Sequence, residues 1–153
     1  MPISSLNSSG KNTINAGGDP ITSNVLLTGR LDVAEIREVT KDVSISSNIL
    51  LSNYQESNIF YCTSTPGANF TINLTNVPVD NDRVFTVSYI IVQGSTGYIP
   101  SAFQIDGNAV SIKWSNSTTP SATSTSGKID LFTFTVFRRS SAWEILGNVS
   151  RNF

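Results

Sequence analysis

The chain has 153 residues, enough for one domain with a short appendage, and its formal net charge is -1. Charged residues make up only 14% of it, so it offers no basic surface for nucleic acid. It has no histidine and one cysteine, which excludes imidazole catalysis and an intrachain disulfide. Ser, Thr and Asn supply about a third of the residues, a composition that favours turns and strands over helices. These features favour an all-β protein that binds or builds rather than catalyses.

Membrane insertion and secretion are also not expected. No apolar run approaches the roughly 20 residues of a membrane span. The N-terminal sequence MPISSLNSSGKN lacks the apolar block of a signal peptide.

Residues 1–42 are predicted to be an N-terminal arm and connector. Residues 1–23 have scattered single apolar side chains and no periodicity. They are either a disordered tail or an extended arm that orders against a neighbouring subunit. Residues 34–41 (AEIREVTK) fit a helical turn or a strand, and the β-branched Val39 and Thr40 favour extended chain.

Residues 43–153 are predicted to form an antiparallel, jelly-roll-like β-sandwich. Turn residues separate apolar runs throughout this part, and Asp106-Gly107 is the clearest hairpin signal. Short strands at this spacing are typical of a sandwich or barrel. The candidate strands are 43–51, 58–63, 69–75, 83–93, 102–106, 109–114, 129–138 and 142–149.

Two of these strands are apolar on both faces, unlike 69–75, where Asn and Thr alternate with large apolar residues. A two-layer sandwich buries one face of each strand, so strands 83–93 and 129–138 require a third layer. The N-terminal segment or a second copy could provide it, and we favour a second copy, which predicts an oligomer. The residues expected at that interface are Phe132, Phe134, Val136, Ile90 and Val92.

No catalytic, cofactor or metal site is predicted. The spacing of the carboxylates pairs no two of them as glycosidase chemistry requires. Asp80-Asn81-Asp82 offers oxygen ligands for calcium, but these are also ordinary turn residues. Cys62 lies in an apolar strand, where a buried structural thiol is expected rather than a nucleophile.

Aromatic side chains near predicted turns are the candidates for ligand contact. Trp114 and Tyr98 could belong to a sugar-binding platform, or they could be core and rim residues of the sandwich. The loop 115–128, SNSTTPSATSTSGK, fits either an exposed display loop or a plain solvated connection.

Four stretches of the chain stand out as motifs: NIFYCTSTPGANFTINLTNVPVDNDRVFTVSYIIVQGSTGYIP (58–100), IKW (112–114), GKIDLFTFTVFRRSSAW (127–143) and GNVSRNF (147–153). Through them, residues 24–153 resemble a module of virion structural and tail-fibre-like proteins of tailed phages of marine cyanobacteria. The segment LTGRLDVAEIREV resembles the connector that precedes this module in longer fibre chains. One departure is Ser115-Asn116-Ser117, where the family often has glycines.

The resemblance implies a non-enzymatic virion protein, assembled in the host cytoplasm and commonly homotrimeric. No repetitive shaft precedes the module, so the expectation is a small surface component, either a capsid decoration or cement protein or a short fibre-like tail protein. Its partners would be further copies of itself and other capsid or tail proteins. The alternatives are a receptor- or carbohydrate-binding tip that contacts a host surface glycan, and a hydrolase such as a depolymerase.

Overall fold

The computed structural model describes residues 5–6, 12–13 and 36–153. Contacts divide the chain into two units, Met1–Ile36 and Arg37–Phe153. In the first, strand β1 (Ser5–Leu6) pairs antiparallel with β2 (Asn12–Thr13). The rest of the predicted arm that falls on residues 1–4, 7–11 and 14–35 lies outside the described residues.

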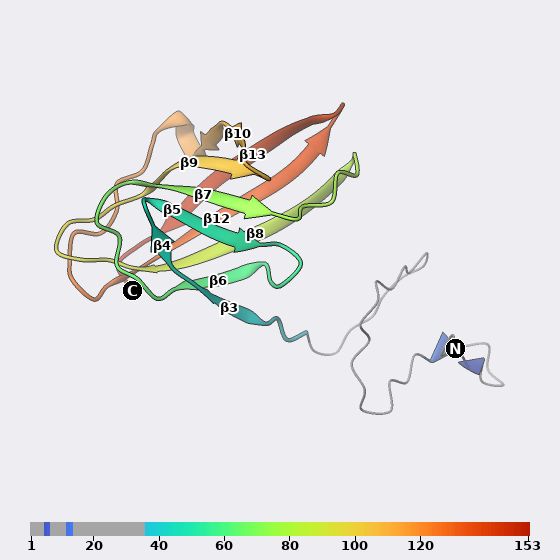
Figure 1. Cartoon of the computed structure of the whole chain (residues 1–153), viewed down its shortest axis with the longest axis horizontal. Helices are drawn as coiled ribbons and strands as arrows, with labels where there is room; N and C mark the ends of the chain where they lie inside the picture. The colour runs from blue at the N-terminus through green and yellow to red at the C-terminus, as the bar shows by residue number, and fades with distance from the viewer. Residues whose placement is uncertain (1–4, 7–11, 14–35) are drawn as a thin grey trace. The chain divides into compact units, whose positions relative to one another are not determined.

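The second unit is all-β, as predicted, with two sheets and one 3-10 turn, η1 (Ser115–Ser117). A five-stranded sheet has the order β10-β9-β7-β5-β4, and a six-stranded sheet has the order β11-β13-β12-β8-β6-β3 (Figure 1). The strands are β3 (Thr40–Val43), β4 (Ile45–Ser46), β5 (Ile49–Asn53), β6 (Ile59–Cys62), β7 (Phe70–Thr75), β8 (Arg83–Val92), β9 (Pro100–Ile105), β10 (Asn108–Val110), β11 (Ile112–Trp114), β12 (Ile129–Arg139) and β13 (Ala142–Ser150).

The sheets are mixed, so the prediction of antiparallel sheets is wrong in part. The pairs β3/β6, β5/β7, β6/β8, β7/β9 and β11/β13 are parallel. Strands β5 to β9 alternate between the two sheets along the chain. The chain therefore reverses between sheets, and strands two apart in sequence meet side by side in the same direction.

Turns and sheet membership explain which predicted strands are confirmed and which are divided into two. The Asp106-Gly107 hairpin is confirmed, with φ of 50° and 80° as a type I′ turn requires. The predicted strand 43–51 is divided by a turn at Ser47 and Asn48, both with positive φ. The predicted strand 109–114 divides at residue 111, because β10 belongs to one sheet and β11 to the other.

The inner faces of both sheets form one hydrophobic core. The ring centroids of Phe134 in β12 and Phe103 in β9 lie 5.1 Å apart, and those of Phe134 and Tyr89 lie 6.0 Å apart. The Tyr89 hydroxyl lies 2.8 Å from the Ser52 hydroxyl of the facing sheet. Burial raises the pKa of Tyr89 above its ordinary value. The core therefore favours the neutral phenol, whose hydroxyl has the Ser52 hydroxyl as its polar partner.

Candidate functional site

Three of the five residues predicted for an oligomer interface are wrong, because the chain's own core already covers them. Phe132, Phe134 and Val136 are fully buried among the side chains of the second unit. Their strand does have two apolar faces, but its inner face packs on the five-stranded sheet. Only Ile90 and Val92 of the predicted set lie on the opposite, partly exposed face.

The outer face of the six-stranded sheet carries a group of apolar side chains. Tyr61 is opposite Ile90, Ile90 is opposite Leu131, and Val92 is opposite Ile129. All five are only partly covered. We call these five residues the outer patch.

Uncharged hydroxyl side chains continue this face from the outer patch. Ser88 is opposite Thr133, and Thr86 is opposite Thr135. The outward positions of β8 from 86 to 92 and of β12 from 129 to 135 therefore carry no charge.

The outer face of the five-stranded sheet differs, because its central strand, β7, is polar, although the neighbouring strand β5 exposes Ile49 and Leu51. Thr71, Asn73 and Thr75 of β7 point away from the core, as predicted, while the residues between them are buried. Gln104 of β9 lies opposite Asn73. Of the two outer faces, the six-stranded sheet thus has the less polar centre.

The two predicted ligand contacts, Trp114 and Tyr98, do not share a site. The Trp114 ring lies 5.7 Å from Phe134 and packs on Gly147, where an added Cβ would come within 2.7 Å of it. Both backbone groups of Tyr98 are held by the buried Gln93 side chain, at 3.2 Å and 2.9 Å. Trp114 is therefore an edge residue of the core, and Tyr98 is part of a braced loop.

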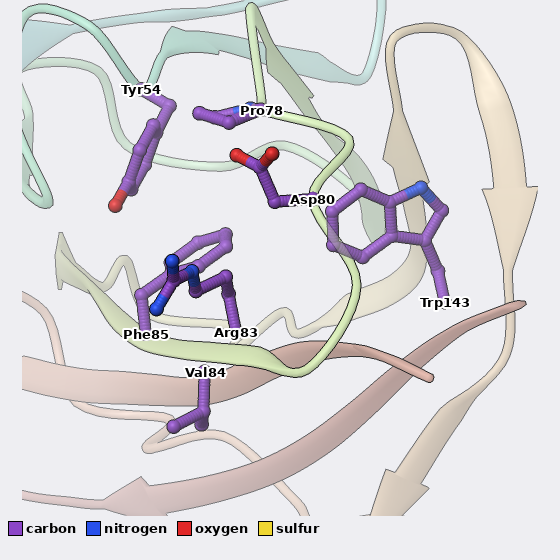
Figure 2. A pocket seen from close by; sticks show the side chains of 7 residues that line it. All are labelled: Tyr54, Pro78, Asp80, Arg83, Val84, Phe85 and Trp143. Carbon is purple, nitrogen blue, oxygen red and sulfur yellow. The ribbon is translucent and has the colours of Figure 1, made fainter. Parts of the chain in front are cut away.

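A different group of aromatic residues lines a hollow of about 220 Å³ that the sequence did not predict. We call it the aromatic hollow. Its rings come from three separate segments, the turn after β5, strand β8 and strand β13. Its lining residues are Tyr54, Pro78, Asp80, Arg83, Val84, Phe85 and Trp143, shown together in Figure 2.

Contacts with Arg138 position the loop and one ring of this hollow. The Arg138 guanidinium donates to the Val79 carbonyl at 2.5 Å and to the Asn81 amide oxygen at 3.3 Å. It also lies 5.7 Å from the centre of the Trp143 ring. The backbone N–H of Ser141 donates to the same Asn81 oxygen at 3.1 Å. The loop between β7 and β8 is thus tied to the β12–β13 hairpin.

Asp130 is a fully buried carboxylate with a structural role that the sequence did not reveal. It accepts hydrogen bonds from the Thr123 backbone and hydroxyl at 2.8 Å and 2.6 Å, from Gln93 at 3.2 Å, and from the Asn152 backbone at 3.2 Å. A buried charge needs such compensation. The network braces the loop 118–128 and the C-terminal residues against the sheet.

The candidate calcium loop 80–82 and Cys62 both make contacts that a structural role explains. Asn81 in the candidate calcium loop uses its side-chain oxygen for the loop contacts above, and the described residues contain no cluster of three metal-ligating side chains. Cys62 is buried, as expected of a structural thiol, and its Sγ lies 3.2 Å from the Ser64 carbonyl.

Ser115-Asn116-Ser117, the segment where the resembled family often has glycines, includes two residues with a backbone conformation typical of glycine. Asn116 and Ser117 have φ of 57° and 54°, the left-handed region that glycine adopts without a steric cost. Glycines at these positions would therefore fit the same backbone.

Comparisons with protein-family models, with curated proteins and with solved structures found no match. Within the described part of the chain, no helix is long and apolar enough to cross a membrane.

Proposed function

We propose that this protein is a non-enzymatic structural component of a tailed-phage virion, and that it works as a homotrimer assembled through the outer patch. In this proposal the two sheets form a jelly-roll-like sandwich, and the N-terminal segment is an arm that anchors it to the capsid or tail. The β-module then projects from the particle as a decoration, cement or short fibre-like protein.

The observation that carries the proposal is the apolar character of the outer patch. Ile90, Leu131 and their neighbours lie on the exposed side of a sheet whose other side is already buried. Interface cores are depleted in charged residues, and the centre of this face carries none. A second copy suits it, because a net charge of -1 gives little repulsion between copies.

The trimer itself rests on the sequence resemblance. Phage modules of this kind are commonly homotrimers, and a closed ring buries the same patch on every copy. The receptor-binding alternative is favoured by a different observation, the aromatic hollow.

The first test is the mass of the full-length protein in solution, by size-exclusion chromatography with light scattering. We expect three times the mass of one chain. Leu131→Asp should give a folded monomer, because it places a charge at the centre of the outer patch. Leu51→Asp is the matched control, since Leu51 is 59% exposed on the other sheet, and it should leave the trimer intact.

The second test is location. Mass spectrometry of separated phage heads and tails should find the protein in one fraction. A wild-type chain that stays monomeric and does not bind particles would overturn the proposal.

A further inference from the structure

We propose that the aromatic hollow binds one ring of a neutral sugar. The hollow shares no residue with the outer patch, so this binding activity is separate from the proposed assembly. Its ligand class follows from three properties of the lining, namely its size, its aromatic rings and its two oppositely charged side chains.

The size and the aromatic lining of the hollow fit a small ligand with an apolar face. Pockets for drug-sized ligands hold about 300–1,000 Å³, and this one holds about 220 Å³. The Tyr54 and Phe85 ring centroids lie 4.4 Å apart, and the Trp143 ring lies across the hollow from Tyr54 (Figure 2). A pyranose ring has faces of C–H groups that pack on aromatic rings and a rim of hydroxyls.

Two oppositely charged side chains supply the polar contacts. The Asp80 carboxylate lies between Tyr54 and Trp143, and Arg83 lies beside Phe85 (Figure 2). Among the described residues, neither makes a hydrogen bond or ion pair through its side chain. A carboxylate only accepts and a guanidinium only donates, whereas a sugar hydroxyl does both.

The same pair of charges argues against a ligand that carries charge of one sign only. A cationic ligand attracted by Asp80 and the aromatic rings would be repelled by Arg83. An anionic ligand attracted by Arg83 would be repelled by Asp80. A neutral polyhydroxyl ring gains from both groups.

The hollow is also preorganised. Arg138 and Ser141 hold the loop that carries Pro78 and Asp80, through Val79 and Asn81. Binding therefore orders little of the chain, and weak individual contacts can still produce measurable affinity.

The test uses the full-length protein and saturation-transfer NMR with glucose, galactose and mannose, together with glucuronate and glucosamine as charged counterparts. We expect at least one neutral hexose to bind, and its charged counterparts to bind more weakly. In Trp114→Phe, Trp143 is the remaining tryptophan, and its fluorescence should change on adding the same hexose.

Matched variants locate the site. Asp80→Asn and Arg83→Gln should each weaken binding by about fivefold or more, because each removes a charge-assisted hydrogen bond. Asp82→Asn and Arg139→Gln are the controls, since both residues lie outside the hollow, and they should leave the affinity unchanged. All four positions are exposed, so the variants should fold.

Several results would overturn the inference. These are no hexose binding up to the solubility limit, stronger binding of a charged sugar, or equal losses in the controls. The oligomeric state is measured separately, so failure here does not depend on the trimer.

Discussion

The two faces of strands β8 and β12 are both apolar, yet they differ in what covers them. On the inner face, Val87, Tyr89 and Phe134 are fully buried by the five-stranded sheet. On the outer face, Ile90 and Leu131 are partly exposed, and a separate block of hydroxyl side chains continues the face along both strands. A strand with two apolar faces is thus expected to have both faces buried. Its sequence does not show which of the two faces is buried by other parts of the same chain.

The largest effect should come from the inner face. Phe134→Ala removes a ring that contacts Phe103, Tyr89 and Trp114, and it should lower the free energy of unfolding by about 3–5 kcal/mol. Denaturant unfolding in the Leu131→Asp background, which the proposed function expects to be monomeric, measures it without a contribution from assembly. In that background Ile90→Ala, on the outer face, should cost about 1 kcal/mol or less. Equal losses would show that the two faces are covered alike.

The second-largest loss of stability should come from removing the buried carboxylate of Asp130. Asp130→Ala leaves the Thr123 backbone N–H and the Gln93 amide without their acceptor, which should cost about 2–3 kcal/mol. Hydrogen exchange should also quicken in the loop 118–128. Thr133→Ala, on the outer face of the same strand, should change stability by no more than about 0.5 kcal/mol and leave the loop protected.

The Tyr89 phenol should make stability fall at alkaline pH. Burial raises its folded-state pKa above the unfolded value of about 10. Its contribution is therefore complete below that unfolded value and is lost as the pH rises beyond it. Tyr89→Phe should cost about 1 kcal/mol at neutral pH by removing the bond to Ser52. The alkaline loss should be shallower in this variant, and an unchanged slope would contradict the assignment.

The smallest change in stability should come from an ion pair at the β3 edge of the six-stranded sheet, which lies on neither of the two faces compared above. Lys41 in β3 lies 2.9 Å from the Glu56 carboxylate, and this contact lowers the pKa of Glu56 below its ordinary value. Such a contribution exists above the unfolded pKa and is lost as the pH falls through the folded one. Because the pair is exposed, Glu56→Gln should leave the melting temperature nearly unchanged, and added salt should remove any difference.

Much of the fold could be predicted from local chemistry. The alternation in 69–75 predicts its buried and exposed faces, and Asp106-Gly107 predicts its hairpin. The hairpin at Ser47-Asn48 was missed, because both residues adopt positive φ without the glycine that marks such turns. The aromatic hollow was missed for another reason, since Tyr54, Asp80 and Trp143 are distant in sequence and meet only through the crossing strands.

The all-β class, most strand positions and the presence of two strands with two apolar faces follow from local features of the chain, because they depend on the periodicity of apolar residues, on turn residues and on composition. The tertiary structure decided that strands alternate between sheets, that Phe132, Phe134 and Val136 are core residues, and that Asp130 is buried. These properties depend on which segments meet across the core, and pairing between distant strands is not written in any local pattern of residues.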